Sequence, residues 1–196
     1  MISRALASKL WLLTGEPAVG KSTALTHILL QVRTAGFVPG GILTREIRNH
    51  GEREGFRLVD IASEVSETLA DVKGIIGPKI GKYRVNLKVL SNLGVEALNR
   101  AAQSSDLVAV DEVGPMELLS PEFRRALHLC VLALSKPALC VVHKRFQDPL
   151  IEELRASRNA IESEITFENR DQLPDELSKD IIRFLRTRPE SGGKNE

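Results

Sequence analysis

The sequence has little of what marks a secreted or membrane protein. Its 196 residues include only two cysteines, Cys130 and Cys140, each among apolar neighbours and without Cys-x-x-Cys spacing. This pattern argues against a disulfide framework or a cysteine metal site, and predicts two small buried side chains in a reducing cytosol. The apolar run near the N-terminus, "LWLL", is too short for a signal-peptide core or a membrane span. A soluble, cytoplasmic protein is therefore expected.

The sequence also has no excess of either charge. It contains 27 basic and 26 acidic side chains, for a net charge of +1. Such a balance gives no global field to attract nucleic acid or an anionic membrane, so neither partner is expected. No internal repeat or linker divides the chain. We expect one domain over residues 1–188, acting as a monomer, and a disordered tail over 189–196, where apolar residues are few.

Short apolar strands alternate with helical patterns along most of the chain, which predicts an α/β fold with a mostly parallel sheet covered on both faces. A polar turn, "RNHGERE", separates two of the strands and predicts a β-hairpin after the second strand. Residues 74–90 indicate a loop and a strand. The expected strands are 9–14, 40–47, 55–61, 107–112, 138–143 and 163–169. One helix is expected between the glycine turn and Gly36, and the other expected helices are 95–102, 121–134, 148–157 and 175–188.

A glycine-rich loop lies between the first strand and the first helix. "GEPAVGKS", residues 15–22, matches G-x-x-x-x-G-K-[ST], the Walker A or P-loop pattern. The glycines let consecutive N–H groups face one anion, Lys21 would reach the terminal phosphates and the Ser22 hydroxyl would ligate Mg²⁺. The alternative, a surface turn with an incidental lysine, accounts less well for the flanking strand and helix. Ala18 takes a position that is often glycine, where its methyl group should be tolerated.

Two adjacent acids end the apolar strand "LVAVDE". Acids at the carboxyl edge of a parallel sheet lie where α/β folds bind ligands, so Asp111 would hold Mg²⁺ and Glu112 would orient or deprotonate a water. Acids that merely cap the next turn are the alternative. The pair resembles the catalytic-glutamate (RecA-like) branch of P-loop proteins, in which another strand separates the acid strand from the glycine-loop strand.

Several further residues could contact phosphate. His143 ends the strand after the acid pair and could sense the γ-phosphate, although a structural histidine is the commoner case. A cation from the same chain would stabilise charge in the transition state, and a solvated surface cation is the alternative for each candidate. The candidates are Arg45, Arg48, Lys79, Lys82 and Arg84.

Larger blocks extend this pattern across nearly the whole domain. The sequence resembles the small P-loop nucleoside triphosphatases first described from thermophiles, which include the vertebrate cancer-related nucleoside triphosphatase. The blocks that carry the resemblance are "LTGEPAVGKST", "GGILTREIR", "GFRLVDI", "GPKIGKYRVN", "VAVDEVGPMEL" and "ENRDQLP".

The resemblance implies Mg²⁺-dependent hydrolysis of ATP, GTP, CTP, UTP and TTP to the diphosphate and phosphate, with low base specificity. It also implies two nucleotide-contacting segments. The first is Gly15, Glu16, Pro17, Ala18, Val19, Gly20, Lys21, Ser22 and Thr23, and the second is Leu107, Val108, Ala109, Val110, Asp111, Glu112, Val113 and Gly114.

Two other functions remain open at this point. A nucleotide or small-molecule kinase shares the glycine loop but usually has an arginine-rich lid, which "FRRAL" and "RFLRTR" do not resemble. A nucleotide-dependent switch protein would hydrolyse slowly to reset a partner interaction. "NRDQ", residues 169–172, is not the N-K-x-D motif of a guanine-specific switch, and this absence favours a hydrolase with loose base choice.

Overall fold

The computed structural model describes residues 9–134 and 136–187, and the strands of this part form one nine-stranded sheet in the order β5-β6-β4-β3-β2-β7-β8-β1-β9. In chain order the elements are β1 (Leu10–Thr14), α1 (Lys21–Thr34), β2 (Pro39–Asn49), β3 (Glu52–Asp60), β4 (Ser66–Asp71), β5 (Lys79–Ile80), β6 (Tyr83–Val85), α2 (Leu87–Val89), η1 (Leu90–Gly94), α3 (Val95–Ser104), β7 (Leu107–Val113), η2 (Glu117–Leu119), α4 (Pro121–Leu127), η3 (His128–Ala133), β8 (Ala138–Val142), α5 (Pro149–Ala156), β9 (Ala160–Glu164) and α6 (Leu173–Thr187).

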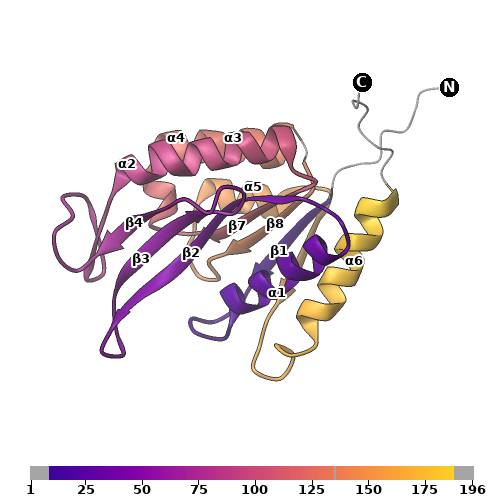
Figure 1. Ribbon diagram of the computed structural model, residues 1–196, viewed down its shortest axis with the longest axis horizontal. Helices are drawn as coiled ribbons and strands as arrows, with labels where there is room; N and C mark the ends of the chain where they lie inside the picture. The colour runs from indigo at the N-terminus through magenta and orange to yellow at the C-terminus, as the bar shows by residue number, and fades with distance from the viewer. Residues whose placement is uncertain (1–8, 135, 188–196) are drawn as a thin grey trace.

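Helices cover both faces of the sheet, as Figure 1 shows for α2, α3 and α4 on one face and α1 and α6 on the other. Successive side chains of a strand point to opposite faces, so β1 contributes to two separate cores. Leu10 and Leu12 pack with the helices α2 to α5, whereas Trp11 and Leu13 pack with α1 and α6. The predicted three-layer α/β architecture is confirmed.

The half of the sheet that carries the glycine loop is parallel. β1 pairs with β8 and β9, β8 pairs with β7, and β7 pairs with β2, all in parallel. The acid strand β7 is therefore separated from the glycine-loop strand β1 by β8, as the resemblance to the catalytic-glutamate branch predicts. Because parallel strands end at the same edge, this order brings Thr14 and Asp111 to one side of the molecule.

The other half of the sheet is antiparallel. β2 continues past its pairing with β7 and forms the predicted hairpin with β3, then β4, β6 and β5 follow in antiparallel order. The polar turn is shorter than predicted, because the strands continue to Asn49 and Glu52 and leave only His50 and Gly51 between them. Both of these residues have positive φ, which a two-residue hairpin turn of this kind requires.

One predicted strand has different bounds. The sequence pattern places a strand over 163–169, but β9 covers Ala160–Glu164. The Asn169 side chain accepts a hydrogen bond from the Thr166 N–H and donates one to the Glu164 carbonyl, so the chain turns after β9. Ile165 is buried in the core beyond the strand end, and this apolar residue extended the apparent pattern.

Residues 74–90, predicted as a loop and a strand, contain the two short strands β5 and β6 and the start of the helical segment at α2. The helix predicted over 121–134 is helical as α4 and η3, with a π-helical second half. Both cysteines are free and buried. None of the helices in the described residues has the length and apolar character needed to cross a membrane. The predicted tail over 189–196 lies outside the described residues.

Candidate active site

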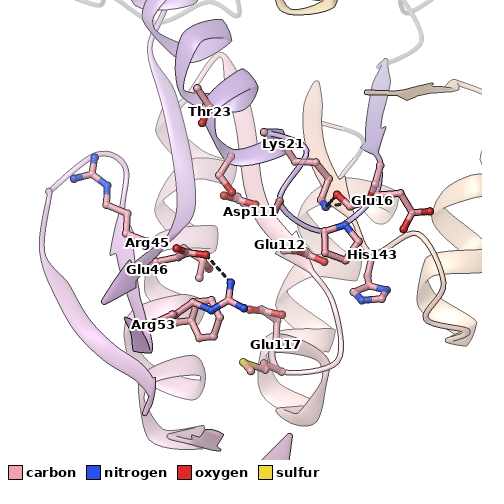
Figure 2. Close-up of a pocket in the computed structure, with 18 of the residues that line it drawn as sticks. Glu16, Lys21, Thr23, Arg45, Glu46, Arg53, Asp111, Glu112, Glu117 and His143 are labelled. Atoms are coloured by element: carbon pink, nitrogen blue, oxygen red, sulfur yellow. Dashed lines mark hydrogen bonds and ion pairs between the residues drawn. The ribbon is translucent and has the colours of Figure 1, made fainter. Parts of the chain in front are cut away.

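A cleft of about 1130 Å³ opens at the carboxyl edge of the parallel strands and continues toward the β2–β3 hairpin. Figure 2 shows the glycine loop and the two acids on one side and the hairpin with Arg45, Glu46 and Arg53 on the other. The lining residues are Gly15, Glu16, Pro17, Ala18, Gly20, Lys21, Ser22, Thr23, Thr26, His27, Leu30, Thr44, Arg45, Glu46, Arg48, Arg53, Phe56, Ile80, Gly81, Tyr83, Asp111, Glu112, Pro115, Met116, Glu117, His143, Lys144 and Arg145.

The glycine loop is held in a conformation that suits small residues. A side chain at Gly15 would place its Cβ 2.6 Å from the carbonyl oxygen of Ile165, and backbone at that distance cannot move aside easily. Gly20 has φ 112° and Ala18 has φ 63°, both in the left-handed region that favours glycine. The positive φ at position 18 explains why glycine suits that position, and Ala18 adopts it at a cost of about 1–2 kcal/mol.

The first turn of α1 is open to an anion. Gly20 precedes the helix and provides no side-chain cap, and the first turn contains no acidic residue. The free N–H groups and the positive end of the helix dipole therefore face the loop. Lys21 donates to the carbonyl oxygens of Gly15 and Glu16, at 3.0 and 3.1 Å, and so lies folded back inside the loop that it would serve.

Asp111 is the most deeply buried acid of the cleft, with 2% of its surface exposed. Burial raises its pKa to about 7, against a hydrogen bond with Ser22 that lowers it. Its Oδ2 atom has no hydrogen-bond partner among residues 9–134 and 136–187. A buried carboxylate oxygen without a partner is costly unless a cation or donor approaches it, so Asp111 and Ser22 have the chemistry of a divalent-metal site.

Glu112 lies next to Asp111 and lines the cleft, so the structure brings together both acids and the loop. Burial raises the pKa of its carboxyl group, while the positive charges of Lys21 and His143 oppose that shift. A carboxylate with a raised pKa is a better proton acceptor near neutral pH than an ordinary glutamate. The position and the environment of Glu112 suit a general base.

Glu117, which the sequence analysis gave no role, is a third acid in the same cleft. It is 5% exposed, and burial together with the charge of Glu112 raises its pKa to about 8. A methyl group at Gly114 would lie 3.3 Å from both Glu112 Oε1 and Glu117 Oε2, so the two carboxyl groups flank that glycine. The sequence feature that could have indicated a buried acid here is the position of Glu117 within the apolar run "PMELL".

The raised pKa of Glu117 predicts a pH-dependent stability. Above its usual pKa of 4.5 the unfolded carboxyl group ionises, whereas the folded one stays protonated up to about pH 8, so stability falls as the pH rises through this window. Relative to Glu117→Gln, the ligand-free wild type should lose on the order of 2–4 kcal/mol between pH 5 and pH 8. Urea unfolding at both pH values measures this, with the exposed Glu122→Gln as control. The prediction would be contradicted if the free energies of unfolding of the wild type and Glu117→Gln differed by the same amount at both pH values.

Two cations beside the loop form ion pairs with Glu16. Glu16 accepts hydrogen bonds from Lys144 at 3.0 Å and Arg145 at 2.9 Å, and these contacts lower the pKa of Glu16. The pairs attach the glycine loop to the segment that follows β8. His143 lines the cleft, but its Nδ1 atom accepts the backbone N–H of Phe146 at 3.0 Å. This bond gives His143 a structural role in the turn, alongside its effect on Glu112.

The candidate phosphate-binding cations divide into two groups. Arg45 and Arg48 line the cleft, whereas Lys79, Lys82 and Arg84 are not among its lining residues. Lys82 instead lies over the Tyr83 ring, at 5.5 Å from its centre. Arg53, which the sequence analysis did not single out, lines the cleft and forms an ion pair with Glu46 at 2.5 Å.

Part of the predicted nucleotide-contacting segments is buried. The side chains of Val19, Val113 and residues 107–110 belong to the hydrophobic core and are at most 2% exposed, and none of them lines the cleft. Gly114 is also buried. The side chains of these residues support the loop and the two acids, so nucleotide contacts at these positions would come from backbone atoms, and the contacts themselves stay a prediction.

The strand order, the loop between β1 and α1, and the acid pair on β7 together define a P-loop NTPase fold. The crystal structure of THEP1 from Aquifex aeolicus superimposes with a TM-score of 0.75 at 27% identity, covering 86% of this chain and 96% of that one. The solution structure of a human cancer-related nucleoside triphosphatase has the same TM-score at 28% identity, with 89% and 97% covered.

Sequence comparison identifies the family. The model of an NTPase family matches residues 11–178. The nucleoside-triphosphatase THEP1 of Methanosarcina acetivorans is 42% identical over 173 residues, which cover 88% of this chain and 96% of the relative, and that of Thermofilum pendens is 37% identical over 183 residues, 92% and 99%. The chain belongs to this NTPase family. The predicted family and enzyme class, a nucleoside triphosphatase, are thereby confirmed.

Proposed function

We propose that the protein hydrolyses ATP, GTP, CTP, UTP and TTP to the diphosphate and phosphate, in a Mg²⁺-dependent reaction with low base specificity. The observation that carries the proposal is the position of Glu112, a half-buried acid with a raised pKa in the same cleft as Lys21 and Asp111. The activity for which the relatives are named, nucleoside triphosphatase, supports it.

In this proposal each residue of the site has one task. The backbone N–H groups of the glycine loop, to which Pro17 contributes none, and of the first turn of α1 bind the phosphates. Lys21 leaves the carbonyl groups of the loop to neutralise charge that develops on the terminal phosphates. Glu112 accepts a proton from the attacking water, whose oxygen bonds to the γ-phosphorus as the bond to the diphosphate breaks.

Ser22 and Asp111 would hold the metal ion. The unpartnered Oδ2 of Asp111 beside the Ser22 hydroxyl fits this role, because Mg²⁺ binds through few protein oxygens and completes its shell with water and phosphate. When bound, the ion would neutralise charge on the phosphate oxygens.

Low base specificity is supported by the segment after β9. Asn169 uses its side chain to close the turn to Thr166 and Glu164, rather than presenting it to a base. Arg170, Asp171 and Gln172 do not line the cleft. A motif that reads guanine needs free polar side chains at such a loop.

A phosphate-release panel tests the proposal. The five triphosphates should give kcat/KM values within about tenfold of one another, a spread of ~1.4 kcal/mol, and chelation of Mg²⁺ should abolish release. A preference of more than about a hundredfold for one base, or release that persists without divalent metal, would contradict the proposal.

A further inference from the structure

The cleft contains more space than hydrolysis needs. In P-loop enzymes the γ-phosphate lies beside the acid strand, so the region beyond Glu112 faces the γ-phosphorus from the side of the attacking nucleophile. Here that region extends to the hairpin and to Gly81 in the β5–β6 turn. The cavity of about 1130 Å³ would hold the triphosphate along the glycine loop, and the attacking water would take only a small part of the space on the hairpin side of the two acids.

The far wall of this region is aromatic, with its two rings inclined at 67° to each other. Phe56 and Tyr83 pack edge to face at 5.0 Å, and the Arg53 guanidinium lies 5.2 Å from the centre of the Phe56 ring. Arg53 also donates to the Tyr83 hydroxyl at 3.0 Å and pairs with Glu46, so these groups hold one another in place. Ile80 and Met116 add apolar surface. Rigid aromatic and guanidinium planes of this kind suit a flat ring.

The near wall supplies one buried acid. Glu117 lines the cleft at 5% exposure, and its carboxyl group accepts hydrogen bonds only from the backbone at Gly114 and at Glu117 itself. No side chain among the residues that the structure describes binds it. A buried carboxyl group with unused hydrogen-bonding capacity beside an apolar wall is the arrangement that recognises the N–H groups of a heterocycle.

We propose that the outer part of the cleft binds a nucleoside-like acceptor, a flat nitrogen heterocycle that carries a hydroxyl group, and that the enzyme transfers the γ-phosphoryl group to it in competition with water. The inference rests on the proposed function, because the same loop and Glu112 act in both reactions. The acceptor oxygen bonds to the γ-phosphorus, the bond to the bridging oxygen breaks, and the nucleoside diphosphate leaves with the electron pair. Glu112 takes the hydroxyl proton.

A labelling experiment tests the transfer. The wild type with Mg²⁺ and ATP labelled at the γ-phosphate is incubated separately with adenosine, cytidine, guanosine, uridine and pyridoxine at millimolar concentration. Labelled phosphate monoester and labelled inorganic phosphate are then both measured. At least one probe should yield a monoester, and the ratio of monoester to phosphate should fall about tenfold or more in Phe56→Ala and in Glu117→Gln. The control Leu129→Ala, an exposed apolar residue of η3, should leave that ratio unchanged.

The outcomes separate the two proposals. Phosphate release without a monoester from any probe would overturn the acceptor site and leave the hydrolysis intact. An unchanged ratio in both variants would overturn the placement of the acceptor, and inhibition of hydrolysis without transfer would overturn its role as acceptor. Absence of phosphate release in the wild type without any probe would instead contradict the proposed function itself.

Discussion

Replacing Glu112 with glutamine is expected to lower turnover about 10²- to 10⁴-fold while triphosphate binding persists. The amide has nearly the same shape as the carboxylate, so the loop, Asp111 and Lys21 keep their positions. It cannot accept a proton, however, and the attacking water then has no base. Because burial raises the pKa of Glu112, the acid limb of the wild-type pH–rate profile should lie above pH 4.5 and should be absent in the variant.

Single-turnover phosphate release and equilibrium binding of a non-hydrolysable triphosphate separate chemistry from affinity in this experiment. Glu122→Gln is the matched control, because Glu122 has a half-exposed side chain on α4 and does not line the cleft. Turnover of Glu112→Gln close to that of the wild type would remove Glu112 from the mechanism. A large loss of affinity with unchanged chemistry would make it a binding residue instead.

The centre of the site could be predicted because its chemistry depends on local patterns. The glycine loop needs a strand before it and a helix after it, and both are visible in the apolar pattern around residues 15–22. Asp111 and Glu112 follow an apolar run, which places them at a strand end without knowledge of the sheet. The position of a strand between β1 and β7 was predicted from the resemblance to a branch of P-loop proteins and not from the periodicity of the sequence.

The outer cleft could not be predicted, because its residues meet only through tertiary contacts. β4 was not predicted, because only Leu69 and Ala70 of its six residues are buried and the segment therefore lacks a regular alternation of buried and exposed residues. Without β4 the position of Tyr83 against Phe56 is unknown. Arg53 belonged to a predicted turn that proved to be strand, and its pairing with Glu46 depends on that register.

Glu117 shows the same limit for electrostatics. Its burial results from the turn after β7, where Gly114 lets two carboxyl groups approach from either side. Burial is the main cause of the shift of its pKa to about 8. Since the burial of a single acid is not visible in the sequence, the sequence alone predicts an ordinary pKa for this residue. From the sequence alone, the segment "VGPMEL" indicated only the family. In the structure it also supplies Glu117, an acid that lines the cleft.

Replacing Lys21 with alanine is expected to lower both the affinity for triphosphate and the rate of hydrolysis. A charge-assisted hydrogen bond to a charged partner contributes about 1.5–3 kcal/mol, so binding alone should weaken roughly ten- to a hundredfold. The loss in kcat/KM should be larger, because negative charge grows on the phosphate oxygens in the transition state.

The ligand-free structure adds a second consequence of losing Lys21. The lysine now donates to the carbonyl oxygens of Gly15 and Glu16, so the alanine variant leaves both without this donor and should loosen the loop even before a nucleotide binds. Hydrogen exchange of residues 15–20 should therefore be faster in Lys21→Ala than in the wild type. Lys73→Ala is the matched control, since Lys73 is an exposed cation paired with Glu54 away from the cleft. Unchanged triphosphate affinity in Lys21→Ala would exclude the loop as the phosphate site and would leave the lysine only its role in holding the loop together.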